Sequence, residues 1–184
     1  HIDGGITIGA HDHGRMIDCN SGAGGDGPFT PSRIGSVGIV DFIDFANGKD
    51  LDQLKHLCNV GGGFSSLLDT NDADEVMRRI QNGDTAAKRA WDTMVYQICK
   101  YIGSMATVLC GKVDAILLTG GLMRFDCIIE EIKNRCGFIA PVYVYPGEVE
   151  QEAMASGAMR VLTGKESPKT YTGIPVFNGF DDEK

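Results

Sequence analysis

The sequence has 184 residues, of which 42% are apolar and 23% charged, a composition typical of an ordinary soluble globular protein. The length allows one domain with a hydrophobic core and is too short for two domains of usual size. The net charge is −8 and no run of Lys and Arg is present, which weighs against nucleic acid or acidic membranes as partners. No segment is apolar over the ~18 residues that a membrane span needs, so we expect a cytoplasmic protein.

Cysteine and glycine usage adds two expectations. The six cysteines include no Cys-x-x-Cys pair, and most lie in apolar, helix-like stretches. We therefore expect reduced core thiols rather than disulfides or a metal site. Nine of the 25 glycines fall within the first 35 residues, which indicates sharp turns or close approaches of the backbone there.

The first part of the chain predicts a hairpin and then a long loop. Residues 5–10 and 15–19 are β-rich, and Asp12-His13-Gly14 between them suits a hairpin turn. Residues 20–36 are dense in Gly, Pro and Ser. Long irregular loops in compact domains are often functional.

Helical spacing begins near Val37. We predict a helix over 37–45 with one buried face, a short helix over 51–58, and a third that begins at Asn71 or Asp72 and ends at Gln81. The clearest helix covers about 85–109. Its apolar stripe steps by three or four residues and should face the core: Ala87, Trp91, Met94, Ile98, Ile102, Met105 and Leu109.

The pattern after Gly111 alternates between strand and helix. Strands are predicted over 113–119 and 142–145, and helices over 125–135 and 150–162. This order implies parallel strands joined by a crossover helix. From Thr163 the chain is polar and rich in Pro and Gly, which predicts a loosely docked tail.

Two glycine pairs are candidate ligand-binding turns. Gly120-Gly121 follows a strand, the position at which open α/β sheets bind ligands. Gly4-Gly5 lies beside His1; glycine amides can cradle phosphate oxygens, and an imidazole can donate to charge on a transferring phosphoryl group. Taken alone, each pair is better explained as a purely structural turn.

Charged side chains provide further candidates. Arg33 is the only arginine in the Gly-rich loop and suits a carboxylate or phosphoryl group, with a solvent-exposed loop arginine as the alternative. Glu150 and Glu152, near a helix start, suit a magnesium ion, although the helix dipole favours Glu there in any case. His11 and His13 show no third ligand, and we interpret them as strand or turn residues.

Several short segments of the sequence, taken in their order along the chain, resemble the motifs of the acetate and butyrate kinase family. The resemblance is carried by His1-Ile2-Asp3-Gly4-Gly5-Ile6 with His11, Gly14 and Asp18, by Gly25 to Arg33, by Thr70-Asn71-Asp72, by Leu118-Thr119-Gly120-Gly121, and by Tyr145-Pro146-Gly147-Glu148 with Glu152. It covers about 1–163. The Pro-Phe-Thr-Pro loop is closer to butyrate than to acetate kinases.

The resemblance implies an α/β fold of the actin-like, sugar-kinase-like (ribonuclease H-like) ATPase type, with a mixed sheet that contains parallel strands and is flanked by helices. Residues 1–163 would form the C-terminal nucleotide-binding domain of a two-domain kinase, and 164–184 a polar tail. The partner would be the N-terminal half of the same protein, without which we expect no activity. A homodimer or higher homo-oligomer is also expected.

The implied reaction is reversible transfer of the γ-phosphoryl group of ATP to butyrate or a related short-chain or branched acid, which gives ADP and an acyl phosphate. Mg²⁺ is the implied metal. Acetate kinase is the alternative within this class. A kinase-like protein that binds nucleotide without turnover is the alternative from another class.

Roles carry over by position in the motifs. His1 would stabilise the transferring phosphoryl group, and Arg33 would orient the carboxylate or phosphoryl group. The remaining residues would contact phosphates (Gly4, Gly5), adenosine (Asp72, Gly120, Gly121) and magnesium (Glu150 or Glu152, with Glu148 beside them).

Two positions depart from the family pattern and add negative charge near the expected nucleotide. Asp3 stands in place of a phosphate-loop glycine, and Asp74 in place of an arginine expected to flank the adenine. Like charges there would weaken binding. Arg78 and Arg79, one helical turn further on, are candidates to compensate.

Overall fold

The computed structural model describes residues 1–22, 25–147 and 149–174. Two compact units are present, His1–Gly147 and Glu148–Lys184, and each is described by itself. The second unit contains helix α7 (Glu150–Leu162), which has the predicted bounds. The expected division of the whole chain into a domain at 1–163 and a tail at 164–184 stays a prediction.

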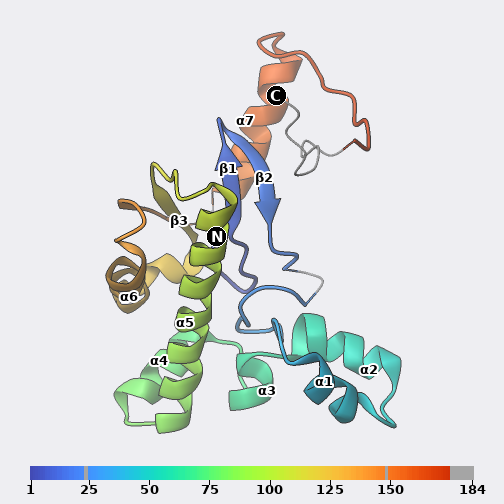
Figure 1. Ribbon diagram of the computed structural model, residues 1–184, viewed down its shortest axis with the longest axis vertical. Coiled ribbons are helices and arrows are strands. Elements are labelled where there is room, and N and C mark those ends of the chain that lie inside the picture. Colours follow the sequence, from blue (N-terminus) through green and yellow to red (C-terminus); the bar gives the residue numbers. More distant parts are fainter. Residues whose placement is uncertain (23–24, 148, 175–184) are drawn as a thin grey trace. The chain divides into compact units, whose positions relative to one another are not determined.

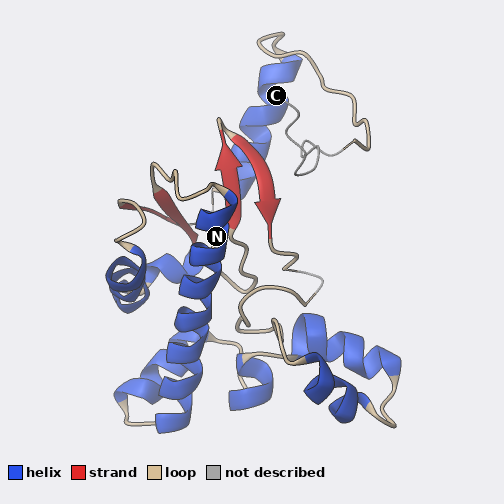
Figure 2. Cartoon of the chain, in the orientation of Figure 1, coloured by secondary structure: helices blue, strands red, loops and turns tan. Residues whose placement is uncertain are grey.

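Two pairs of strands lie in the first unit (Figures 1 and 2). β1 (Gly9–Asp12) and β2 (Arg15–Cys19) are antiparallel. His13 and Gly14 join them with φ angles of 48° and 76°, the left-handed conformations of a tight hairpin turn. The predicted hairpin is confirmed, and His11 and His13 are strand and turn residues as expected.

The predicted parallel crossover is also confirmed. β3 (Ile116–Gly120) leads through the short helix η2 (Gly121–Arg124) and helix α6 (Asp126–Cys136) to β4 (Val142–Pro146). β3 and β4 pair in parallel. The described residues thus form two two-stranded sheets, where we expected one mixed sheet.

Helix α5 (Thr85–Val108) organises the core of this unit and contacts α4, α6 and β1 (Figure 1). Asp84 caps its first turn by accepting hydrogen bonds from the N–H groups of Ala86 and Ala87. Trp91 stacks on Phe64 with a centroid distance of 5.9 Å. The predicted stripe is buried as far as Ile102, while Met105 and Leu109 line a cavity instead.

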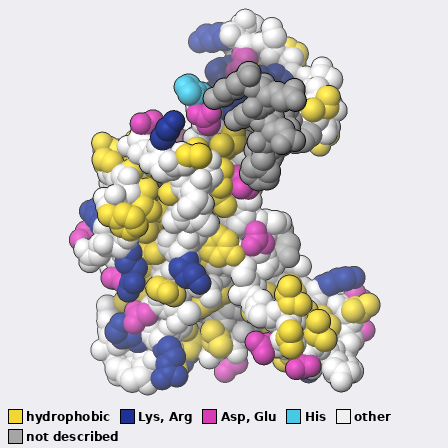
Figure 3. All heavy atoms as spheres, in the orientation of Figure 1, with side chains coloured by type: hydrophobic (Ala, Val, Ile, Leu, Met, Phe, Trp, Pro, Cys, Tyr) yellow, Lys and Arg dark blue, Asp and Glu magenta, His cyan; other side chains and the backbone are white. Residues whose placement is uncertain are grey.

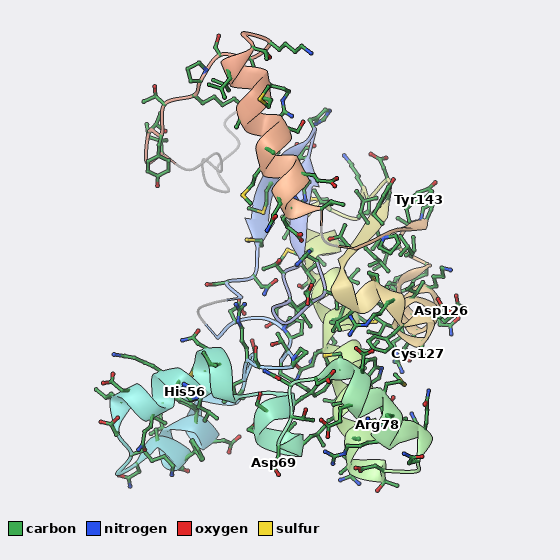
Figure 4. All side chains as sticks on the ribbon, turned by 180° about the vertical axis from the view of Figure 1, so that it is seen from behind. His56, Asp69, Arg78, Asp126, Cys127 and Tyr143 are labelled. Carbon is green, nitrogen blue, oxygen red and sulfur yellow. The ribbon has the colours of Figure 1, made fainter. Side chains whose placement is uncertain are left out.

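The helices between the hairpin and α5 are short. They are α1 (Ile39–Ala46), α2 (Leu51–His56) continuing into a π turn (η1, Leu57–Gly61), α3 (Phe64–Leu68) and α4 (Ala73–Gln81). Asp69 ends α3 with a φ of 58° (Figure 4). The expected buried face of the first helix is wrong: within the described chain no residue of α1 is buried. Figure 3 shows hydrophobic side chains gathered over it.

The cysteines match the prediction only in part. All six are free thiols, as expected. Cys99 and Cys136 are buried, and Cys136 Sγ lies 3.8 Å from the Cys99 carbonyl oxygen. Three others are exposed and not core residues: Cys19, Cys110 and Cys127. In the described part of the chain, no helix has the length and hydropathy of a membrane span.

Candidate active site

The two glycine pairs singled out in the sequence meet at one carboxylate. Asp3 Oδ1 accepts a hydrogen bond of 2.7 Å from the N–H of Gly4. Asp3 Oδ2 accepts one of 3.0 Å from the N–H of Gly121. Two backbone donors from separate turns therefore converge on a single anionic position, which is an arrangement that can bind a phosphate oxygen.

Close packing of two backbone segments requires a glycine at position 120. Its φ is 104°, and a Cβ on it would lie 2.4 Å from the carbonyl oxygen of Ile2. Ile2 donates its N–H to Thr119 O at 2.8 Å and accepts from Leu122 N–H at 3.1 Å. The absent side chain at this position admits the first residues of the chain, and this brings His1 and Asp3 to the turn.

His1 lies at the same turn. Its Nδ1 is 3.2 Å from the hydroxyl oxygen of Thr119, at hydrogen-bonding distance, and the side chain is exposed. This contact holds the imidazole at Thr119, the residue that precedes Gly120 and Gly121. The structure thus brings together His1, Gly4, Gly5, Gly120 and Gly121, although their roles toward a ligand stay predictions.

Arg33 packs directly against the first glycine pair. A Cβ on Gly5 would lie 2.6 Å from Arg33 Nη1, and one on Gly22 would lie 3.2 Å from the same atom. The guanidinium is half-buried and makes no hydrogen bond or ion pair with any residue that the structure describes. A cation with unused donors, held beside converging amides, fits an anionic ligand.

A buried threonine ties the Arg33 loop to Gly4. Thr30 is 1% exposed, and its hydroxyl donates to Gly4 O at 2.7 Å. The Thr30 hydroxyl oxygen in turn accepts from the N–H groups of Ser32 (3.2 Å) and Arg33 (3.0 Å). Thr30 therefore sets the position of Arg33 relative to Gly4, a role that sequence reasoning missed.

Helix α5 anchors the same loop from the other side. Gln97 Oε1 accepts from Phe29 N–H at 2.8 Å, and the Tyr101 hydroxyl accepts from Gly27 N–H at 3.1 Å. Gln97 and Tyr101 were not predicted. They lie four residues apart on one face of the helix, next to the apolar stripe, and this spacing is the signal that could have identified them.

Asp26 is part of this anchor. Its carboxylate accepts hydrogen bonds from the backbone of Ser21 and Gly27 and from the hydroxyls of Tyr101 and Ser36. Partial burial acts to raise the pKa of Asp26, but these hydrogen bonds outweigh it, so its pKa lies below the ordinary value of 3.8. A carboxylate that stays ionised keeps the loop attached to α5.

Asp72 and Asp74 lie at the start of α4, on the expected adenosine side. The Asp72 carboxylate caps α4 by accepting from the N–H groups of Asp74 and Glu75. Asp74 forms an ion pair with Arg124, with 2.9 Å between Oδ2 and Nη2. Arg124 also donates to Gly121 O at 2.7 Å, which connects α4 to the second glycine pair.

The expectation that Arg78 and Arg79 compensate the charge of Asp74 is wrong, because Arg124 pairs with Asp74 instead. Arg79 pairs with Asp84 at 2.8 Å and donates to Leu68 O at 2.7 Å, so it serves the α4–α5 connection. Arg78 lies exposed on α4 (Figure 4). The cation that meets Asp74 comes from η2, 50 residues further along the chain.

The predicted magnesium ligands belong to the second unit. Glu150 and Glu152 occupy the first turn of α7 in the second unit, and Glu148 lies outside the described residues. Among the residues described, no group of three or more His, Cys, Asp or Glu side chains is arranged to hold a metal ion. The role of Glu150 and Glu152 stays a prediction.

Comparison with known families gives a match over most of the chain. Residues 1–138 match the model of the acetokinase family. This range includes every candidate site residue of the first unit, from His1 to Gly121, and ends before α7.

Solved structures with similar folds agree with this match. Acetate kinase from Porphyromonas gingivalis aligns with a TM-score of 0.77 and 24% identity, over 88% of this chain and 48% of that one. A propionate kinase from Francisella tularensis aligns with a TM-score of 0.72 and 21% identity, over 82% of this chain and 45% of that one. Acetate kinase from Entamoeba histolytica aligns with a TM-score of 0.75 and 17% identity, over 86% of this chain and 50% of that one. The likeness confirms an α/β domain of the acetate kinase, actin-like type, and the chain spans about half the length of these proteins.

Proposed function

The chain belongs to the acetokinase family, and we propose that it supplies the phosphate-binding half of a kinase that phosphorylates a short-chain carboxylic acid. The observation that carries the proposal is the convergence of the Gly4 and Gly121 amides on one carboxylate, with the Arg33 guanidinium packed against Gly5 beside it. These donors fit a polyphosphate chain, because each offers an N–H group to an oxygen anion.

ATP would provide the phosphoryl group in this reaction. A carboxylate oxygen of the acid attacks phosphorus, the bond from phosphorus to the leaving oxygen of ADP breaks, and the product is an acyl phosphate. The amides of Gly4 and Gly121 hold phosphate oxygens, and Arg33 orients the acid or the transferring group. His1 donates to the charge that develops on that group.

The Asp3 side chain has to leave these amides before a phosphate can use them. Nucleotide binding in this protein then includes the displacement of one anion by another. We expect this exchange to lower the affinity for ATP relative to a protein with glycine at this position.

Butyrate, or a branched acid of similar size, is the proposed substrate. The support is the Pro-Phe-Thr-Pro loop that ends at Arg33, which resembles butyrate kinases more than acetate kinases. Acetate is the alternative acid. The other half of the protein would complete the acid pocket and the magnesium site.

The test is an assay of the full-length protein for ATP- and Mg²⁺-dependent acyl phosphate formation with acetate, propionate, butyrate and isobutyrate. Preference for four-carbon acids and a loss of at least a hundredfold in kcat for His1→Ala would support the proposal. His13→Ala, at the exposed turn of the hairpin, serves as the matched control and should keep activity. Preference for acetate would support the alternative acid.

A protein that binds nucleotide without turnover is the second candidate. The observation that favours it is the Asp3 carboxylate, which occupies both amide donors. Clear nucleotide binding without acyl phosphate from any of the four acids would support this reading.

Self-association is part of the proposal as well. α1 carries exposed apolar side chains on Ile39 (77% exposed), Val40 (71%) and Ile43 (61%). Exposed apolar patches of this kind are typical of protein interfaces. A second copy of the protein, in a homodimer, is the proposed partner for this face.

A further inference from the structure

Two polar side chains are buried among the residues that the structure describes, and both hold the backbone around Arg33. One is Thr30, which sets the position of the loop as described above, and the other is Asn20, which is 2% exposed. Burial of an amide costs free energy unless its donors and its acceptor find partners. The contacts of Asn20 therefore indicate what this buried amide does.

The side chain of Asn20 joins three backbone groups from two segments of the chain. Its Oδ1 accepts from the N–H of Ile8 at 2.6 Å. Because a backbone N–H can only donate, this contact settles which end of the amide is the oxygen. Nδ2 then faces two carbonyl oxygens, those of Ile6 (3.2 Å) and Asp26 (3.4 Å). Gly27 leaves the space for this group, since a Cβ on it would lie 2.2 Å from Nδ2.

The two segments that Asn20 joins also border the guanidinium of Arg33. Gly5 directly precedes Ile6, and a Cβ on it would lie 2.6 Å from Arg33 Nη1. A Cβ on Gly22 would lie 3.2 Å from Nη1 and 3.2 Å from Ile6 O. Gly22 in turn donates its N–H to Asn20 O at 3.1 Å. The guanidinium thus lies against two positions without side chains, and the amide of Asn20 connects the segments that carry them.

We propose that Asn20 is a positioning residue for Arg33, because its buried amide holds the Gly5 and Gly22 segments at the separation that places the guanidinium. The described residues give this guanidinium no hydrogen bond or ion pair, so the shape of its surroundings sets its position. Asn20 acts on the reaction only through Arg33 and does not touch ATP or the acid. The inference rests on the role proposed above for Arg33 and adds the residue that fixes where its donors are presented.

The change Asn20→Asp separates this role from a contribution to stability alone. The carboxyl group has nearly the shape of the amide, but its ionised form cannot donate to the carbonyl oxygens of Ile6 and Asp26, and it repels them. Burial and these oxygens favour the neutral carboxyl group, which donates again once it is protonated. Mild acid should therefore restore the position of Arg33. The Asp26 carboxylate, with its lowered pKa, stays ionised throughout and does not contribute to this change.

The first readout is the mobility of the Arg33 Nε–H group, measured by ¹⁵N NMR relaxation on full-length protein with labelled arginine. Arg79 is the reference for intact folding, because its Nε donates to Asp84 Oδ2 at 2.8 Å. The wild type, Asn20→Asp and Asn20→Ala are compared at about pH 7 and about pH 5.5, a range in which a buried carboxyl group can change its protonation. Asn134→Asp makes the same change at an exposed position of α6 and is the matched control.

The three proteins should give three patterns. Arg33 should be rigid at both pH values in the wild type and in Asn134→Asp, mobile at both in Asn20→Ala, and mobile only at the higher pH in Asn20→Asp. In the acyl phosphate assay, Asn20→Ala should lower kcat at least about tenfold and leave the KM for ATP within about twofold, because a displaced guanidinium affects orientation rather than nucleotide contacts. The kcat of Asn20→Asp, relative to the wild type at the same pH, should recover in mild acid.

The outcomes distinguish this inference from the proposed reaction. A rigid Arg33 in Asn20→Ala, or in Asn20→Asp at the higher pH, with the Arg79 signal intact, would overturn the inference whether or not the protein turns over an acid. A kcat ratio of Asn20→Asp that does not change with pH in an active enzyme would also overturn it. The expected mobility pattern without acyl phosphate from the wild type would support the role of Asn20 and refute the kinase reaction.

A variant of the opposite wall keeps the test decisive if a change at the buried amide prevents folding. Gly22→Ala leaves Asn20 intact and introduces a methyl group 3.2 Å from Arg33 Nη1. It should shift the Arg33 Nε–H resonance while that of Arg79 stays in place. An unshifted Arg33 resonance would show that these segments do not set the position of the guanidinium and would overturn the proposal.

Discussion

The carboxylate of Asp3 accepts a hydrogen bond of 3.0 Å from the backbone N–H of Gly121, although the two residues are 118 positions apart in the chain. Asp3 and Gly121 lie on the two turns that the sequence marks as candidate ligand sites. This contact shows that the turns share one anionic position. It also shows that the protein's own carboxylate occupies that position.

Replacing Asp3 therefore tests the site directly. Asp3→Gly is expected to tighten ATP or ADP binding about tenfold, because it frees two amides and removes a charge that repels phosphate. Asp3→Asn should fall in between, since an amide oxygen can still accept a hydrogen bond but carries no charge. Isothermal titration calorimetry on the full-length protein measures the affinities. Asp12→Asn, at the hairpin turn, is the control, and unchanged or weaker binding in Asp3→Gly would refute the argument.

Thr30 gives a test of the Arg33 loop. Thr30→Val removes one donor and one acceptor inside the protein and leaves the N–H groups of Ser32 and Arg33 without their partner, at a cost of about 2 kcal/mol in unfolding free energy. Activity should fall further than stability predicts, because Arg33 loses its fixed position. Thr30→Ser keeps the hydroxyl and should restore both. Chemical denaturation and kcat are the readouts, and a Thr30→Val enzyme with full kcat would separate Thr30 from the site.

The Asp74–Arg124 pair is suited to a charge exchange. Asp74→Arg or Arg124→Asp alone should lower stability by at most about 1 kcal/mol, because both side chains are about half exposed or more. The double exchange should recover this loss. Arg124→Asp should also weaken nucleotide binding, since it removes the cation that pairs with Asp74 and adds a carboxylate near Gly121. An exchange of the exposed pair Lys55 and Asp52 is the control. Additive single effects would show that the pair does not act as a unit.

The lowered pKa of Asp26 leads us to expect that the stability of the fold depends on pH. Its pKa is lower in the folded protein than the ordinary 3.8, so its hydrogen bonds stabilise the fold above that pH and are lost as pH falls through the folded value. Asp26→Asn should lower the melting temperature by about 3 °C at pH 7. The difference from the wild type should shrink below pH 3.8. Thermal unfolding followed by circular dichroism measures it, and a constant difference from pH 7 to pH 3 would contradict the assignment.

The sequence predicted local elements well because their signals are local. The cap of α4 at Asn71 or Asp72, the Asp12-His13-Gly14 turn and the bounds of α7 all depend on a few neighbouring residues. The apolar stripe of α5 was likewise readable from its spacing. Parallel pairing of β3 and β4 followed from the handed geometry of a strand–helix–strand unit.

Contacts across long separations were not predictable in the same way. Thr30 meets Gly4 and Arg124 meets Asp74 only after the chain has folded, and a single sequence holds no signal for either pair. The spacing of Gln97 and Tyr101 indicates a shared polar face on α5, but it does not show which loop that face contacts. The buried face expected for α1 was wrong for a related reason: periodicity shows that a face is apolar, but not what covers it.

That face supports the last prediction. Val40 and Ile43 are 71% and 61% exposed on α1, and we propose that a second copy of the protein covers them. The double variant Val40→Ser and Ile43→Ser should raise the dimer dissociation constant at least tenfold, because it removes apolar area that association would bury. Leu67→Ser, a residue of α3 with the same 61% exposure as Ile43, should leave association unchanged. Sedimentation velocity on the full-length protein distinguishes the two outcomes, and a dimer that persists in the double variant would assign the interface to another surface.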